Sequence, residues 1–176
     1  MAESVALTKA EISALLHALN DELAARHEHG EVHVVGGAVM CLAFDAREST
    51  RDVDATFKPA AAVRAAAARV GARAGKPENW LNDAVKAFVS THGTFDTWLE
   101  LPNLRVFLAQ PQYVLAMKCM AMRLGAEFHD LNDVRYLIRY LNIESAADAL
   151  DIVAQYFSAK DIPPKAQFAV EAMFAE

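Results

Sequence analysis

The chain has 176 residues, a hydrophobic fraction of 54% and a formal net charge of −6. This length suits one domain, or a small α/β unit followed by a helical extension, and the apolar fraction is sufficient for a core. The acidic balance excludes a general nucleic-acid coat, because sequence-independent binding depends on many Lys and Arg contacts to phosphate.

The sequence shows no sign of membrane insertion or of a disulfide framework. No uninterrupted apolar run reaches the ~18 residues of a membrane span, and Met1–Ser4 is not a basic region that leads into an apolar stretch. We therefore expect a soluble, cytoplasmic protein without a membrane partner. Cys41 and Cys119 each lie among apolar neighbours, so we expect two buried thiols rather than a disulfide.

The first half of the chain alternates helices with strands. Thr8 and Glu11 have the spacing of a capping box, which predicts a helix that runs to about Arg26. Apolar periodicity and the turn residues then predict a strand over 31–35, a buried helix over 38–43, a strand over 51–58 and a long helix over 60–74.

The second half contributes one further strand and then only helices. A short helix is expected within 79–85 and a strand over 104–109, followed by helices over 111–124 and 130–141 and two more introduced by Ser145 and Pro163. This order predicts an α+β fold with an α/β core, in which helices flank a small mixed sheet of three short strands. We expect residues 1–110 to form this core and residues 111–176 to form a C-terminal helical part packed on it.

Glycines and aspartates supply the most informative pattern. Gly36–Gly37 follows a predicted strand, and glycines at a helix start allow backbone N–H groups to approach a phosphate. Asp52 and Asp54, at i and i+2 on a strand, point to one face, where their repulsion calls for a cation or for exposure. Each motif alone has a simpler explanation, a routine turn or an exposed edge, but together with Arg47 and Thr50 they favour a nucleotidyl-transfer site with Mg²⁺.

A basic residue inside an apolar helix has two open interpretations. Lys118 is the only cation between Tyr113 and Met122, so it either snorkels to the surface or points into a site. Asp130 and Asp133, at i and i+3 on the next predicted helix, either complete a polar wall or pair with Arg123.

Two other clusters are weaker candidates. His27, His29 and His33 are close enough in sequence to suggest Zn²⁺, but they straddle a helix end and a strand, which favours a polar loop. The segment 59–76 contains four bases and no acid, which indicates either a local basic face or an ordinary solvated helix surface: Arg64, Arg69, Arg73 and Lys76.

The ordered set of motifs resembles the nucleotidyltransferase-like proteins of the DNA polymerase β superfamily. It is especially similar to small bacterial members related to the nucleotidyltransferase toxins of abortive-infection toxin–antitoxin systems. The resemblance covers most of residues 30–141 and consists of Val34 to Ala38, Arg47, Thr50, Asp52, Asp54, Trp80 to Val85, Ala116 to Lys118, Arg123, Asp130 and Asp133.

The resemblance implies an enzyme that moves a nucleoside monophosphate from an NTP to a hydroxyl acceptor, with Mg²⁺ or Mn²⁺ as cofactor. The acceptor is a protein, an RNA end or a small molecule. The implied metal ligands and catalytic residues are Asp52 and Asp54. The implied nucleotide-binding residues are Gly36, Gly37, Arg47, Thr50, Lys118 and Asp133.

Two departures from the family pattern keep a second hypothesis open. Ala38 stands where the superfamily usually has Ser, and the strand expected to hold a third carboxylate presents Arg105. The nearest acids are Asp83, Asp96 and Glu100. Without that carboxylate the base that activates the acceptor hydroxyl is unassigned. The alternative is therefore a noncatalytic interaction protein of the same fold, one half of a toxin–antitoxin pair with a cognate partner protein.

Overall fold

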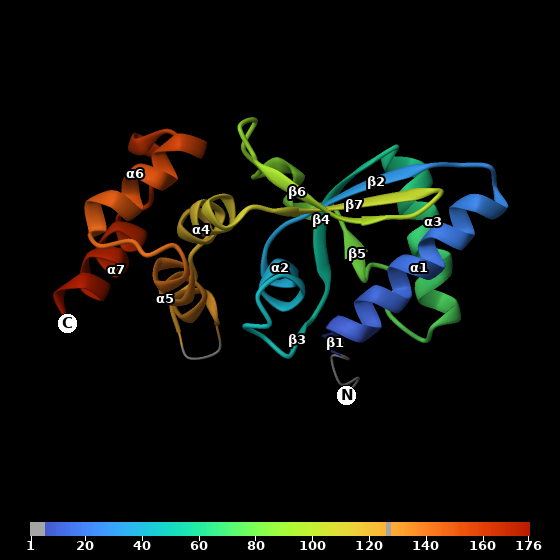
Figure 1. The fold of residues 1–176 in the computed structure, drawn as a ribbon, viewed down its shortest axis with the longest axis horizontal. Helices are drawn as coiled ribbons and strands as arrows, with labels where there is room; N and C mark the ends of the chain where they lie inside the picture. The colour runs from blue at the N-terminus through green and yellow to red at the C-terminus, as the bar shows by residue number, and fades with distance from the viewer. Residues whose placement is uncertain (1–5, 126–127) are drawn as a thin grey trace. The chain divides into compact units, whose positions relative to one another are not determined.

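The computed structural model describes residues 6–125 and 128–176. Met1–Ser4, the segment that is not expected to begin a leader peptide, lies outside the described residues. Within them the chain forms seven α-helices, a five-stranded mixed sheet and a two-stranded sheet (Figure 1). The predicted α+β fold with helices at its C-terminal end is confirmed. None of the described helices is both long enough and apolar enough to cross a membrane.

The chain divides into two compact units. The first extends to Phe88 and includes Phe95–Ala109, whereas the second comprises Val89–Thr94 and Gln110–Glu176.

The five-stranded sheet of the first unit has the strand order β5-β4-β2-β7-β6. The central strand β2 pairs antiparallel with β4 and parallel with β7, while β5 and β6 form the two edges. Its strands are β2 (Gly30–Val34), β4 (Val53–Lys58), β5 (Leu81–Asn82), β6 (Phe95–Glu100) and β7 (Leu104–Ala109).

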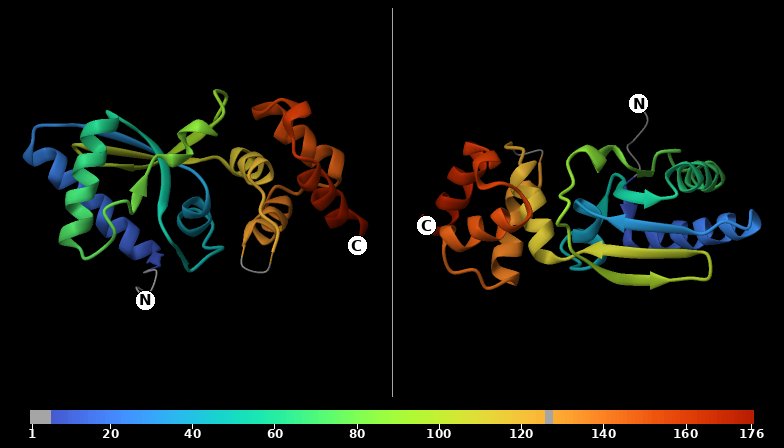
Figure 2. Two further views of the ribbon diagram at one scale, coloured as in Figure 1. Left: turned by 180° about the vertical axis from the view of Figure 1, so that it is seen from behind. Right: turned by 90° about the horizontal axis from the view of Figure 1, so that it is seen from above.

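Helices α1 (Lys9–Ala25) and α3 (Ala60–Arg73) pack against each other and cover one face of this sheet (Figures 1 and 2). The approach is close, because a Cβ on Gly30 of β2 would lie 2.9 Å from Val63 of α3 and 3.1 Å from Leu23 of α1. Along β2 and β4, residues that face these helices are buried and alternate with more exposed residues. The alternation leaves the other face, which we call the open face, to polar and aromatic side chains.

The first unit also contains the helix α2 (Gly37–Leu42) and several short elements. A two-stranded sheet joins β1 (Leu7–Thr8) to β3 (Ser49–Thr50), and a 3₁₀ turn, η1 (Ala84–Ala87), follows β5. The α1 capping box is present as predicted, with both reciprocal bonds between Thr8 and Glu11.

The prediction of three strands was incomplete. The structure adds β6 and the two-residue strands β1, β3 and β5, the last of them where a short helix was expected. β6 lies at a sheet edge and none of its residues is fully buried, so its sequence shows no apolar alternation. The two-residue strands are too short to show a periodic pattern. They are defined by pairing with distant strands, and the periodicity of a single sequence does not detect such pairing.

The second unit is a helical bundle. It contains α4 (Pro111–Met120), α5 (Asp130–Tyr140), α6 (Ala146–Tyr156), η2 (Ala159–Asp161) and α7 (Pro164–Ala175), with α4 in contact with α5, α6 and α7. The rings of Tyr113 and Tyr156 stack at 5.0 Å in its core, and the Tyr113 hydroxyl accepts a bond from the Ser90 backbone N–H at 2.9 Å. The loop Val89–Thr94 is thereby attached to the bundle.

Both cysteines, Cys41 in the first unit and Cys119 in the second, are free and buried, as predicted.

Candidate functional site

Asp52 and Asp54 lie on either side of the buried Val53. Because β4 begins at Val53, Asp52 precedes the strand by one residue, and the prediction that both aspartates lie within the strand was wrong to that extent. Asp54 is the register partner of Asn82 on β5, and the Asn82 side-chain amide donates to Asp52 Oδ2 at 3.2 Å. Register partners direct their side chains to the same face of a sheet. The two carboxylates therefore share the open face, as the i, i+2 spacing predicts.

Asn82 is held in this position by the residue pair before it. Trp80 is 1% exposed, and its indole N–H donates to the Ala67 carbonyl of α3 at 2.8 Å. The Val53 backbone N–H donates to the Trp80 carbonyl at 2.7 Å, which continues the pairing of β5 with β4. Sequence reasoning included Asn82 in the family pattern but gave it no role. The available signal was a buried aromatic and aliphatic pair directly before a polar amide.

The Gly36–Gly37 turn passes directly beside Asp54. Gly36 has a φ of +71° and a ψ of −149°, a conformation that only glycine adopts readily, and a Cβ there would lie 3.4 Å from Asp54 Oδ2. The Val35 backbone N–H also donates to the Asp54 carbonyl at 2.9 Å. The glycine motif and one of the two carboxylates thus form one local structure.

Arg47 and Thr50 lie over the second glycine. A Cβ on Gly37 would be 2.6 Å from Arg47 Nη1 and 3.4 Å from Thr50 Oγ1, so glycine is the residue that allows the guanidinium this close to the backbone. The loop that carries both residues is anchored by the pairing of Thr50 with Leu7. The structure therefore brings together the Gly36–Gly37 turn, Arg47, Thr50 and Asp54.

The electrostatics of Asp52 favour an added cation. Burial raises the pKa of the Asp52 carboxyl above its ordinary value, against the lowering effects of the Asn82 hydrogen bond and the Arg51 charge. A bound divalent cation would oppose this effect by favouring the ionised form. Mg²⁺ is commonly held by one or two carboxylates together with substrate phosphates, and the donor set of Asp52 and Asp54 fits that chemistry.

No third carboxylate joins the pair within the described residues, where no group of three or more His, Cys, Asp or Glu side chains is arranged to hold a metal ion. Asp83, the nearest acid on the chain after β5, accepts instead from Arg64 Nη2 at 2.5 Å. The departure from the family pattern noted in the sequence is therefore also present in the described structure.

Lys118 is buried within a cluster of charges in the second unit. Its side chain is 9% exposed, and its Nζ lies 3.1 Å from Asp130 Oδ1 and 2.8 Å from Asp133 Oδ2. Asp130 Oδ2 also accepts from the backbone N–H and the Nε of Arg123, both at 3.0 Å. Burial alone would raise the pKa of Asp130, but the hydrogen bonds and charges of Arg123 and Lys118 lower it.

This cluster decides one of the open interpretations of Lys118. The snorkelling alternative is wrong, because the ammonium is enclosed and bound to two carboxylates. The pairing of Arg123 with Asp130 is confirmed. Roles for Lys118 and Asp133 toward a nucleotide stay predictions.

The basic segment of α3 does not form an unpaired cationic face. Its four bases are engaged by three acids, two of them on α1, in the ion pairs Arg64 with Asp83, Arg69 and Arg73 with Glu22, and Lys76 with Glu11, at 2.5 to 2.7 Å. The two pairs of Glu22 join α3 to α1, and the pair of Lys76 joins the segment after α3 to α1, so these three pairs stabilise the helix pair behind the sheet. The alternative of a local basic face is therefore not supported.

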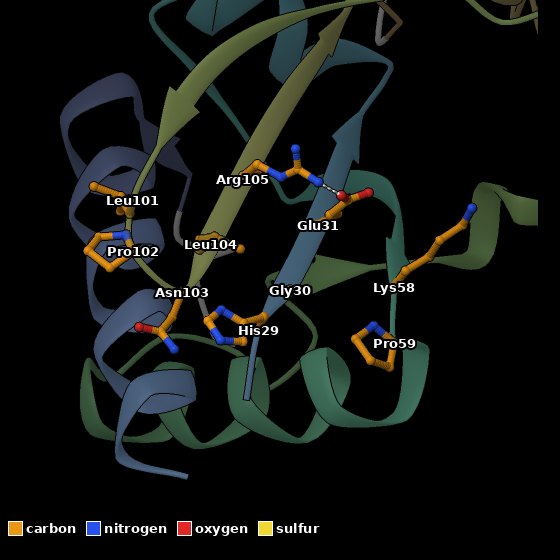
Figure 3. A pocket seen from close by; sticks show the side chains of 10 residues that line it. All are labelled: His29, Gly30, Glu31, Lys58, Pro59, Leu101, Pro102, Asn103, Leu104 and Arg105. Atoms are coloured by element: carbon orange, nitrogen blue, oxygen red, sulfur yellow. Dashed lines mark hydrogen bonds and ion pairs between the residues drawn. The ribbon is translucent and has the colours of Figure 1, made fainter. Parts of the chain in front are cut away.

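The first unit also contains a pocket of about 590 Å³ at the opposite end of β2 from Gly36 (Figure 3). Ten residues line it: His29, Gly30, Glu31, Lys58, Pro59, Leu101, Pro102, Asn103, Leu104 and Arg105. Arg105 forms an ion pair with Glu31 across its floor. None of the site residues predicted from the sequence lies in this pocket.

Comparisons of the chain with protein-family models, with curated proteins and with solved structures found no match. A functional assignment therefore rests on the residues of the site themselves.

Proposed function

We propose that this chain is a Mg²⁺-dependent nucleotidyltransferase that moves a nucleoside monophosphate from an NTP to a hydroxyl acceptor and releases pyrophosphate. The observation that carries the proposal is the convergence of Asp52 and Asp54 on one face, with the Gly36–Gly37 turn beside Asp54 and Arg47 and Thr50 over that turn. These are the groups that a metal-bound triphosphate requires within one local structure.

Each residue has a distinct role in this proposal. Asp52 and Asp54 hold Mg²⁺ or Mn²⁺, and Asn82 is a positioning residue that orients the Asp52 carboxylate. When bound, the metal supplies positive charge that offsets the charge developing on the triphosphate oxygens. The Gly36–Gly37 turn admits the phosphates, to which the Arg47 guanidinium donates hydrogen bonds. The Thr50 hydroxyl donates to the Asp52 carbonyl at 3.2 Å and so supports the loop beside the phosphates.

The wider setting of the proposal comes from the family resemblance. The acceptor is a hydroxyl of a protein, an RNA end or a small molecule. A cytoplasmic location and a toxin–antitoxin system with a cognate partner protein belong to the same proposal. The charge balance of the α3 bases supports a localised substrate site rather than a broad nucleic-acid surface.

A second candidate function is a noncatalytic interaction protein of the same fold. The observation that favours it is the lack, among the described residues, of a third carboxylate beside Asp52 and Asp54. Such a protein would bind an NTP without transferring any part of it.

The direct test is incubation with each of four α-³²P-labelled NTPs, Mg²⁺ or Mn²⁺ and a cell extract, followed by separation of protein, RNA and small molecules. We expect one class of acceptor to become labelled by the wild type and not by the Asp52→Asn, Asp54→Asn double variant. Glu100→Gln, which neutralises an exposed acid on the edge strand β6, is the matched control and should label normally. Nucleotide binding without labelling would favour the noncatalytic protein, and neither binding nor labelling would contradict both.

A further inference from the structure

A row of aromatic rings lies on the open face of the sheet, next to the carboxylate pair. His33 on β2 is the register partner of Phe107 on β7, and their rings stack at 4.6 Å with an interplanar angle of 11°. Phe95 on β6 meets the same imidazole edge to face, at 4.9 Å and 82°. The two phenyl rings fix the orientation of the His33 ring without the use of its nitrogens.

The free side of His33 is turned toward the candidate site. β2 lies between β7 and β4, so a ring stacked from the β7 side presents its opposite face to β4. There the register partner of His33 is Thr56, and Asp54 is the next residue along β4 on the same face. Diagonal neighbours of this kind in an antiparallel pair are roughly 7–8 Å apart, so one substrate group can contact both side chains.

The His33 imidazole is available for proton transfer. Within the described residues His33 makes two ring contacts and no hydrogen bond, and every buried side-chain nitrogen or oxygen there has a partner. The ring nitrogens of His33 are therefore accessible. The charged groups that face it are Glu31 on its own strand, Asp54 and Lys58 on β4 and Arg105 on β7. Burial lowers the pKa of His33, Lys58 and Arg105 lower it further, and Glu31 raises it, so the imidazole is neutral near pH 7.

We infer that His33 is the residue that accepts the proton of the acceptor hydroxyl, the role that the family pattern gives to a third carboxylate. This inference rests on the proposed function. The hydroxyl oxygen forms a bond to the α-phosphorus as its proton moves to an imidazole nitrogen, and the bond from that phosphorus to the bridging oxygen breaks. Pyrophosphate leaves with that electron pair, and the imidazolium then releases its proton to water.

The test compares His33→Gln with His29→Gln, a matched control whose histidine lies in the exposed loop before β2. Both variants should bind the Mg²⁺ complex of the NTP as the wild type does, measured by calorimetry. Transfer of label by His33→Gln should fall by about 10²- to 10⁴-fold, the usual contribution of a general base, whereas His29→Gln should be unaffected. The wild-type rate should decline as the pH falls through the His33 pKa, and His33→Gln should lose that decline.

A second variant provides a readout that does not depend on the fold of His33→Gln. Phe107→Leu removes the stacked ring and exposes the imidazole, so the His33 pKa measured by NMR titration should rise toward 6.5. The pH at which the rate of label transfer declines should rise by the same amount as the His33 pKa.

The outcomes separate this inference from the function on which it rests. Label transfer with an unchanged rate and pH profile in His33→Gln would overturn the role of His33 and leave the nucleotidyltransferase in place. The role of His33 would also be overturned if, in Phe107→Leu, the His33 pKa measured by NMR rises and the pH dependence of the transfer rate does not change. A wild type that binds no NTP and transfers no label would contradict the proposed function itself.

Discussion

Two pairs of closely spaced aspartates, one in each unit, lie in opposite environments. In the second unit Asp130 and Asp133 are 3% and 4% exposed, and both bind the ammonium of Lys118. In the first unit Asp52 and Asp54 remain partly exposed, and Asp52 accepts a hydrogen bond from the neutral amide of Asn82.

The two environments shift the carboxyl pKa values in opposite directions. Arg123 and Lys118 lower the pKa of Asp130 despite its burial, whereas burial raises the pKa of Asp52. A carboxylate pair for which the chain supplies the cations contributes to the fold. Asp52, whose pKa burial raises, is suited to a cation from solution.

The largest effect on stability should come from removing the cation that Asp130 and Asp133 share. Lys118→Met leaves two buried carboxylates without their shared cation, which should lower the free energy of unfolding by about 3–5 kcal/mol in urea titrations. Lys86→Met is the control, because Lys86 is 64% exposed in its ion pair with Asp83 and should cost about 0–0.5 kcal/mol. Equal stability of both variants would show that the Lys118 cluster does not hold the second unit together.

Glu22 extends the comparison to a carboxylate that joins α1 to α3. It accepts from Arg69 at 2.5 Å and from Arg73 at 2.6 Å, and Glu22→Gln should cost about 1–3 kcal/mol of unfolding free energy. The hydrogen bonds of Arg73 and then Arg69 lower the pKa of Glu22 from 4.5 to about 2. Because the unfolded chain binds this proton more readily, the stabilisation is complete above pH 4.5 and is lost as the pH falls toward 2.

The pH dependence of Glu22→Gln provides its own check. Between pH 5 and 2 the unfolding free energy of the wild type should fall more steeply than that of the variant. Parallel curves would indicate that the contacts of Glu22 do not depend on its charge.

The smallest effect on stability should come from neutralising Asp54 in the first unit. Asp54→Asn changes a carboxylate that is only partly buried, so its unfolding free energy should stay within about 0.5 kcal/mol of the wild type or rise slightly. Thermal melts measure this directly. A loss comparable to that of Lys118→Met would place Asp54 among the structural carboxylates.

Local features of this fold were predictable from the sequence. The capping bonds of Thr8 and Glu11, the strand β7 and the starts of α3 and α4 depend on residues within one or two turns of each other. β6 was missed because an edge strand need not alternate polar and apolar residues.

The same distinction applies to the site. The spacing of Asp52 and Asp54 predicted their common face, since two residues on one strand determine it. The role of Asn82 depends on the pairing of β5 with β4, which joins residues 30 positions apart. The enclosure of Lys118 depends on the packing of α4 against α5. No local pattern distinguishes a buried ion cluster from a lysine that points into a site.

Calorimetric titration of ATP, CTP, GTP and UTP, with and without Mg²⁺, into the wild type and Asp54→Asn tests the central claim most directly. We predict Mg²⁺-dependent binding of at least one NTP by the wild type and its loss in Asp54→Asn, with thermal melts that show both proteins folded. Equal NTP affinity in the two proteins would contradict the assignment of Asp52 and Asp54 as a cation site.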